Sequence, residues 1–293
     1  MIDALVNRLI YRPELTRAPK EFTPAALSLG FEGVTFTAKD GIRLTAWYVF
    51  GRKPQHALLY CHGNAGNRRD WINAVPDLVA MGCGVLVFDY RGYGDSDGRP
   101  SESGLYLDGE AAWAWLKSRA DSEGIPASIL GKSLGSAVAA HVSSRTQPYC
   151  LILDSAFTSM DEVIRARVPW LARSLIPRRF ASIEKAPLID CPTLVLHGDQ
   201  DKLVLPVHAL RLYGALKAPK IMRMIEGVGH NDIDSSYQYH NWVKCFLADP
   251  LGLIAEQEET SRSSEAVMRH ITMLIWRGRA HLLGDNDGHW LAP

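Results

Sequence analysis

The chain has 293 residues, enough for one large α/β domain or two smaller domains. Its 47% hydrophobic and 22% charged residues are ordinary for a soluble globular protein. The 32 basic and 32 acidic residues cancel to a formal net charge of +0, which argues against nucleic-acid binding, and no stretch approaches the roughly 18 apolar residues of a transmembrane helix.

Cysteine usage indicates a reducing compartment, so we expect a cytoplasmic protein. The cysteines are odd in number, scattered and without C-x-x-C spacing, which predicts buried free thiols rather than a disulfide framework. They are Cys61, Cys83, Cys150, Cys191 and Cys245. No metal site can be read from the sequence, and we expect neither a metal nor a cofactor.

Residues 1–30 are predicted to form an N-terminal extension without the long apolar core of a signal peptide. An apolar stripe within residues 1–11 has helical spacing. We favour a short helix packed on the body of the protein, and weak interfacial membrane binding is the alternative.

Strand-like and helix-like runs alternate along residues 31–248, which is typical of a mostly parallel sheet with helices on both faces. The first two strands flank a turn and predict an antiparallel hairpin. The expected strands are Phe31–Ala38, Leu44–Phe50, Ala57–Cys61, Val85–Asp89, Ala127–Leu130, Leu151–Asp154, Thr193–His197 and Lys220–Glu226. The expected helices are Arg69–Met81, Ser101–Arg119 with Ser101 or Ser103 as its cap, Ser133–Arg145, Val207–Leu216 and Ser235–Leu247.

Two segments interrupt this alternation. Residues 159–190 read as a small cap-like helical insertion, punctuated by prolines, whose apolar face either lines a substrate pocket or packs on the core. Residues 249–293 read as a linker and a tail helix, because a polar, Ser-rich run precedes an apolar stripe of helical period at residues 267–275. That helix could dock on its own domain, join two copies or remain disordered. The oligomeric state cannot be read from the sequence.

The pattern Gly-Lys-Ser-Leu-Gly at residues 131–135 lies between a predicted strand and a predicted helix. In this context G-x-S-x-G forms a nucleophile elbow, a sharp turn whose small flanking residues let strand and helix approach closely. The pattern therefore predicts Ser133 as a catalytic nucleophile. A serine is a weak nucleophile at neutral pH and needs a base that is oriented by an acid.

In a sheet of this type the acid follows the nucleophile along the chain, and the base follows the acid. Asp201 is our candidate acid, since it lies in the loop after the strand Thr193–His197. Asp199, closer to the strand end, is predicted to stabilise the turn, and Asp154 is a third candidate. His230 is the candidate base, because it sits in a glycine-containing loop after the next strand.

An oxyanion hole requires two backbone N–H donors. One is predicted to come from Leu134, the residue after the nucleophile, at the start of a helix whose dipole favours negative charge. The other is expected from the loop after the strand Ala57–Cys61, where we favour Asn64 over Ala65.

Together these residues resemble the α/β-hydrolase superfamily. The motifs that carry the closer resemblance are His62–Asn67, Asp89–Gly94, Gly131–Gly135 and Gly229–Asp232, within residues 8–248. They are similar to a branch of α/β-hydrolase domain-containing proteins related to bud-emergence and depalmitoylating hydrolases, with prolyl-oligopeptidase-type peptidases as more distant relatives. Many such relatives begin with a membrane-anchoring helix before a segment like residues 9–13. Because only eight residues precede that segment here, we expect no such anchor.

The resemblance implies a serine hydrolase with the α/β-hydrolase fold and no cofactor. We therefore predict cleavage of a small-molecule ester or thioester through an acyl-enzyme, with no nucleic-acid partner and weak or no membrane association. Two alternatives stay open: a peptidase or amidase acting on small peptides, and a non-catalytic binding protein on a hydrolase fold.

Overall fold

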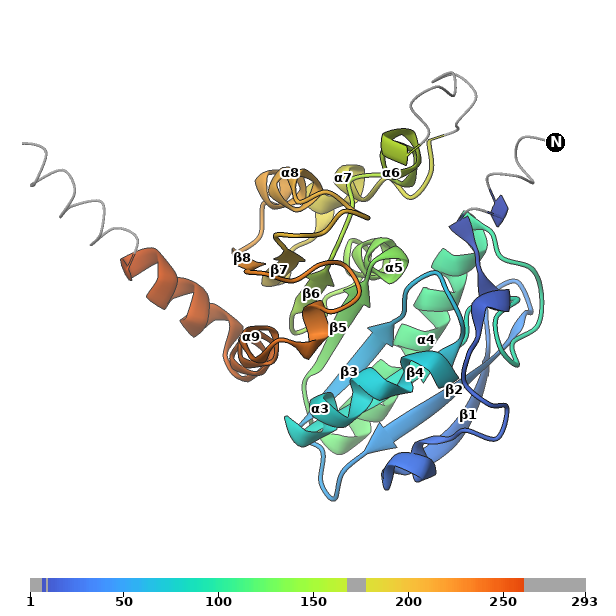
Figure 1. Ribbon diagram of the computed structural model, residues 1–293. Helices are drawn as coiled ribbons and strands as arrows, with labels where there is room; N and C mark the ends of the chain where they lie inside the picture. The colour runs from blue at the N-terminus through green and yellow to red at the C-terminus, as the bar shows by residue number, and fades with distance from the viewer. Residues whose placement is uncertain (1–6, 9, 168–177, 261–293) are drawn as a thin grey trace, which may run out of the picture. The chain divides into compact units, whose positions relative to one another are not determined.

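The computed structural model describes residues 7–8, 10–167 and 178–260, and its internal contacts divide the chain into units Met1–Pro250 and Leu251–Pro293 (Figure 1). The sheet and the candidate site lie in the first unit. Of the predicted linker and tail, residues 251–260 are helical, in keeping with their Leu, Ala, Glu and Gln content. The tail stripe at 267–275 and most of the N-terminal stripe lie outside the described residues.

The first unit contains one eight-stranded sheet with the order β1-β2-β4-β3-β5-β6-β7-β8. β1 pairs antiparallel with β2, and β2 antiparallel with β4, whereas all later neighbours are parallel. The strands are β1 Gly30–Thr37, β2 Arg43–Phe50, β3 His56–Cys61, β4 Cys83–Phe88, β5 Ala127–Lys132, β6 Leu151–Asp154, β7 Thr193–Gly198 and β8 Lys220–Ile225. The predicted fold class, including the N-terminal hairpin, is confirmed.

The centre of the sheet is fully buried. Every residue of β3, β4, β5, β6 and β7 is buried, which explains why these strands read as short apolar runs rather than as alternating patterns. The edge strand β1 is mostly exposed with one buried position, and β8 mixes buried and partly exposed positions. The rigid centre therefore supports the loops that follow β3, β5 and β7.

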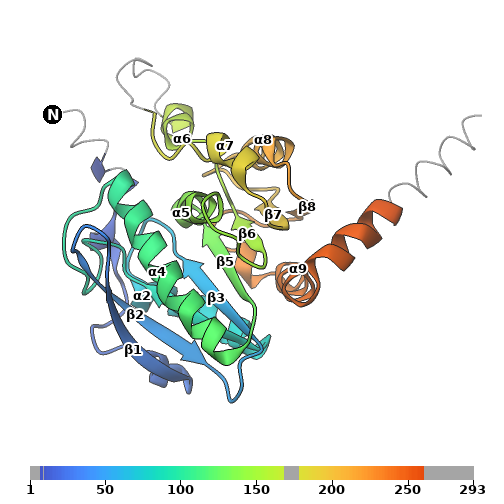
Figure 2. The same cartoon turned by 180° about the vertical axis from the view of Figure 1, so that it is seen from behind.

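Helices cover both faces, with α3 in front of the sheet in Figure 1 and α4 in front in Figure 2. The helices are α2 Arg68–Trp71, α3 Val75–Ala80, α4 Glu102–Glu123, α5 Leu134–Ser143, α6 Met160–Arg167, α7 Ser182–Lys185, α8 Val207–Ala215 and α9 Tyr237–Ala248. The cap prediction for α4 is confirmed, since the Ser101 side chain accepts a hydrogen bond from the N–H of Gly104. Among the described residues, none of the helices combines the length and hydrophobicity needed to cross a bilayer.

The single helix predicted over Arg69–Met81 is wrong in detail. The segment instead forms α2, a 3-10 turn at Ile72–Ala74 and α3. Pro76 explains the break, because proline has no N–H to continue a helical ladder and fits the first turn of a new helix.

The predicted insertion at 159–190 contains α6, α7 and a 3-10 turn at Ala186–Leu188, while residues 168–177 lie outside the described residues. Val163 and Ile164 of its apolar face are each 8% exposed and belong to the hydrophobic core. These two side chains pack on the core, and neither lines the two cavities described below.

Candidate active site

Ser133 occupies a strained turn between β5 and α5. Its φ of 53° and ψ of −116° place an L-residue in a region that favours glycine. Its backbone N–H donates to Asp154 O at 2.9 Å, which ties the turn to β6. A serine held in such a conformation has its side chain directed away from the continuing strand and helix, as a nucleophile elbow requires.

The two glycines of the pattern are required by close packing. A Cβ on Gly131 would lie 2.5 Å from Gly135 O, and a Cβ on Gly135 would collide with the carbonyl oxygens of Cys61 and His62. These contacts are with backbone atoms, which cannot move aside as a flexible side chain can. The start of α5 therefore lies directly against the loop that follows β3.

The packing gives a test. Gly135→Ala should lower the free energy of unfolding by about 3 kcal/mol, the upper end of usual overpacking costs. Gly214→Ala on α8 is the matched control, because a Cβ there meets nothing within 4 Å and alanine is the better helix former. Urea denaturation measures both, and equal stabilities would contradict the packing argument.

The structure brings Ser133, His230 and Asp201 together from three separate loops. His230 Nε2 lies 2.9 Å from Ser133 Oγ, and His230 Nδ1 lies 2.7 Å from Asp201 Oδ2. An ionised carboxylate can only accept hydrogen bonds, so we assign the ring proton to Nδ1. Nε2 is then free to accept from the serine hydroxyl.

Asp201 is buried and firmly held. Its Oδ1 accepts from the N–H groups of Leu203 and Val204 at 2.7 and 2.8 Å. Burial alone would raise the pKa of this carboxyl, but hydrogen bonds from His197 and His230 hold its pKa well below the ordinary 3.8. The side chain is therefore an anion fixed beside the imidazole.

The other candidate acids lie elsewhere. Asp199 Oδ1 accepts from the N–H of Gly227 at 2.8 Å. This bond joins the loop after β7 to the loop after β8. Asp154 is fully buried and contacts Ser155, Tyr239 and Lys132. Within the described part of the chain, neither carboxylate hydrogen-bonds to His230.

The two predicted oxyanion donors lie on adjoining segments. Leu134 is the first residue of α5, and Asn64 is in the loop after β3, whose carbonyls abut α5 at Gly135. Neither backbone N–H donates to another of the described residues. Both groups are thus available to a bound molecule, and the α5 dipole adds positive potential at Leu134.

Lys132 is an element of the site that sequence reasoning missed. It is 3% exposed, and its Nζ lies 2.9 Å from Asp234 Oδ2 and 3.6 Å from Asp154 Oδ2. Burial lowers the pKa of Lys132, and the two carboxylates outweigh that effect and raise it. Because Asp234 belongs to the 3-10 turn just after His230, this ion pair ties the nucleophile strand to the histidine loop. No local motif marks such a long-range pair.

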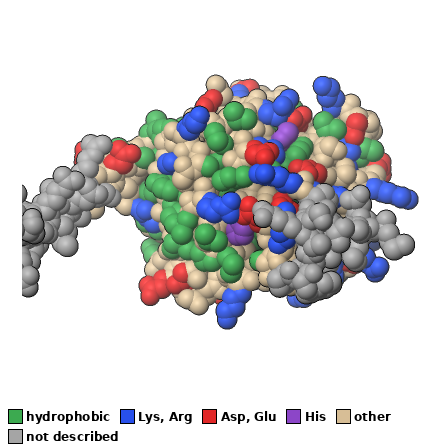
Figure 3. Space-filling model, turned by 90° about the horizontal axis from the view of Figure 1, so that it is seen from above, with side chains coloured by type: hydrophobic (Ala, Val, Ile, Leu, Met, Phe, Trp, Pro, Cys, Tyr) green, Lys and Arg blue, Asp and Glu red, His purple; other side chains and the backbone are tan. Residues whose placement is uncertain are grey.

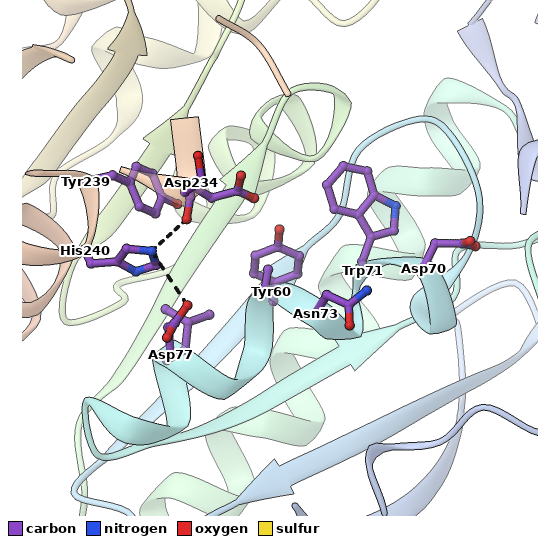
Figure 4. Close-up of a pocket in the computed structure, with 11 residues that line it drawn as sticks. Tyr60, Asp70, Trp71, Asn73, Asp77, Asp234, Tyr239 and His240 are labelled. Carbon is purple, nitrogen blue, oxygen red and sulfur yellow. Dashed lines mark hydrogen bonds and ion pairs between the residues drawn. The ribbon is translucent and has the colours of Figure 1, made fainter. Parts of the chain in front are cut away.

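Two cavities are lined by residues of the described part of the chain, but by none of Ser133, Asp201 and His230. One of about 290 Å³ adjoins the Lys132–Asp234 pair, and Figure 4 shows Tyr60 and Asp234 facing it. Its lining is Tyr60, Asp70, Trp71, Asn73, Ala74, Asp77, Leu78, Asp234, Ser235, Tyr239 and His240. The other, of about 580 Å³, lies between the N-terminal extension and α2 and includes Ala65 and Trp71 in its wall.

Seen from above, the molecule carries interspersed charges of both signs among hydrophobic side chains (Figure 3).

Comparisons with known proteins identify the family and the fold. The sequence profile of the alpha/beta hydrolase fold matches residues 56–182. Alpha/beta hydrolase domain-containing protein 17B of Homo sapiens is 31% identical over 220 residues, covering 74% of this chain and 75% of the human protein. An uncharacterised protein of Mycobacterium tuberculosis is 40% identical over 231 residues, covering 77% and 80% of the two chains.

A solved structure shares the fold. An esterase of Pyrococcus furiosus superposes with a TM-score of 0.70 and 22% identity, covering 83% of this chain and 100% of the esterase. At that identity the likeness concerns the arrangement of strands and helices.

Proposed function

Because this chain belongs to the α/β-hydrolase superfamily, in the branch of the α/β-hydrolase domain-containing proteins, we propose that it is a serine hydrolase of carboxylic esters or thioesters. The observation that carries the proposal is the continuous hydrogen-bond chain from Ser133 through His230 to Asp201. A hydrogen-bonded serine–histidine–carboxylate chain is the arrangement that turns a hydroxyl into a nucleophile at neutral pH.

In the proposed mechanism, Ser133 Oγ attacks the substrate carbonyl carbon while His230 Nε2 takes the hydroxyl proton. The resulting imidazolium is stabilised by the Asp201 carboxylate at Nδ1. It then returns the proton to the departing alkoxide or thiolate, which leaves an acyl ester on Ser133. A water molecule, deprotonated by His230, cleaves this ester and restores the hydroxyl.

The negative charge that develops on the carbonyl oxygen needs donors that are already in place. The backbone N–H groups of Asn64 and Leu134 are the proposed pair, and the loss of one such donor typically slows catalysis by about 10²–10³-fold. Supporting this role, neither N–H donates to another residue in the described part of the chain.

The proposal is tested by covalent labelling followed by turnover. A fluorophosphonate should react with Ser133 alone, identified by mass spectrometry of the labelled peptide, because only a serine beside a base is nucleophilic. Label on a different serine would overturn the assignment of the nucleophile.

Turnover then separates the substrate classes. We expect p-nitrophenyl esters and acyl-thioesters to be cleaved faster than aminoacyl amides, because an amide carbonyl is less electrophilic and its amine leaves only after protonation. A series of acyl-chain lengths locates the preferred substrate. Amide cleavage at the rate of ester cleavage would favour the peptidase alternative instead.

A further inference from the structure

The oxyanion loop, defined here as residues 62–66, has four of its five carbonyl oxygens held by side-chain donors, three of which come from outside the loop. Four consecutive carbonyls accept hydrogen bonds from side chains. His62 O accepts from Tyr90 Oη at 3.1 Å, and Asn64 O accepts from Tyr93 Oη at 3.0 Å. Gly63 O accepts from His62 Nδ1 at 2.7 Å, and Ala65 O accepts from Trp71 Nε1 at 2.8 Å.

The N-terminal extension adds backbone support to the same loop. Arg12 N donates to Asn64 O at 3.0 Å, and Gly66 N donates back to Arg12 O at 3.1 Å. The Asn64 side chain donates to Ile10 O at 3.1 Å. Asn64 O therefore accepts two hydrogen bonds, from Tyr93 and from Arg12.

Fixing carbonyls also fixes N–H groups, because a trans peptide is planar and its C=O and N–H point in opposite directions. The proposed oxyanion donor, the N–H of Asn64, belongs to the same peptide as Gly63 O, which His62 holds. The peptides before and after it are held by Tyr90 and Tyr93. The direction of the donor is thus set by His62 within the loop, and the peptides on either side are held by Tyr90 and Tyr93 from outside it.

The two tyrosines come from the segment after β4 and are fully buried. The ring of Tyr90 packs on that of His62 with centroids 4.4 Å apart, and the ring of Tyr93 lies 5.7 Å from it. His62 is itself buried, and burial lowers the pKa of its imidazole, so it stays neutral with Nδ1 as the donor. The aromatic packing leaves the two phenol hydroxyls little freedom to choose other acceptors.

We propose that Tyr90 and Tyr93 are positioning residues that hold the oxyanion loop with its N–H groups facing the substrate carbonyl. This inference rests on the proposed function and assigns these residues a part in its transition state. Without their hydroxyls His62 O loses its side-chain donor and Asn64 O keeps only the bond from Arg12, so the Asn64 N–H is less tightly aligned. Transition-state binding then weakens while ground-state binding changes little.

The test compares Tyr90→Phe, Tyr93→Phe and the double variant with Tyr48→Phe. Tyr48 is a matched control, because it is fully buried and its hydroxyl has no partner among the described residues. For a p-nitrophenyl ester we expect kcat to fall by about 10–100-fold in the two site variants, the scale of a misaligned catalytic group, with KM changed by less than about twofold. The control should match wild type.

Two further measurements separate positioning from general damage. The Ki of an alkylboronic acid, whose boronate oxygen occupies an oxyanion hole, should rise in proportion to the loss of kcat/KM. The apparent pKa in the pH profile of kcat/KM should stay at the wild-type value, because the contacts of His230 are untouched. If the melting temperatures of the variants lie within a few degrees of the wild-type value, the fold persists.

The result that overturns the inference is distinct from the one that overturns the function. If wild type hydrolyses esters through Ser133 while the site variants keep kcat and boronate Ki within about twofold of the control, the tyrosines have no positioning role. A shift of the pH profile in the variants would likewise count against it, since it would trace the defect to His230. If wild type shows no esterase activity at all, the proposed function itself fails.

Discussion

Replacing Ser133 with alanine should lower kcat for ester hydrolysis by about 10⁶-fold and abolish fluorophosphonate labelling. Without Oγ there is no atom to form the acyl-enzyme, and His230 loses the hydroxyl that lies 2.9 Å from its Nε2. Residual rate above the uncatalysed reaction would come from the oxyanion donors and from substrate binding alone. The residual rate of ester hydrolysis can be measured at high enzyme concentration in assays that are stopped after long incubation.

Ser144→Ala is the matched control, because Ser144 lies at the other end of α5 and its hydroxyl donates only to His141 O among the described residues. This variant should keep wild-type activity. Retention of more than about 1% activity in Ser133→Ala would contradict its role as nucleophile, provided that the preparation is free of wild-type protein.

Replacing Asp201 with asparagine should lower kcat by about 10⁴-fold while leaving the fold intact. An asparagine amide can donate to His230 Nδ1, which moves the imidazole proton to Nε2. That nitrogen then faces Ser133 as a donor and cannot accept the hydroxyl proton. The substitution therefore removes the base without removing the histidine.

Asp199→Asn is the control for this substitution, since that carboxylate closes a backbone turn at Gly227. It should keep kcat near wild type, and equal losses in the two variants would contradict the assignment of Asp201.

The stability of the fold in acid gives a second test of Asp201. The folded pKa of Asp201 lies below 3.8, so its carboxylate stabilises the fold above that pH, and this contribution disappears as the pH falls through the folded pKa. Urea denaturation should show this acid-dependent component in wild type and not in Asp201→Asn.

The sequence was sufficient to predict those parts of the molecule that depend on local patterns. The buried strands are short apolar runs, and the site residues follow them in a fixed chain order, so Ser133, Asp201 and His230 could be selected one strand at a time. The break in the helix predicted over Arg69–Met81 also has a local signal, Pro76, which the prediction did not use.

Contacts between segments far apart in the chain could not be predicted in the same way. The Lys132–Asp234 pair joins residues 102 positions apart, and the hydroxyl of Tyr93 reaches Asn64 O from 29 positions away. A lysine or a tyrosine in a glycine-rich motif has no feature that specifies such a partner. The candidate nucleophile and base can be proposed from the sequence, whereas the long-range contacts around them become visible only once the sheet is assembled.

The left-handed backbone of Ser133 also bears on how this protein can evolve. A non-glycine residue at φ 53° costs of order 1–3 kcal/mol, which glycine would largely avoid. The position of the proposed nucleophile is thus also one where the native residue opposes folding. A screen that rewards heat resistance without testing turnover would favour inactive chains with glycine at this position, so thermostability and activity must be selected together.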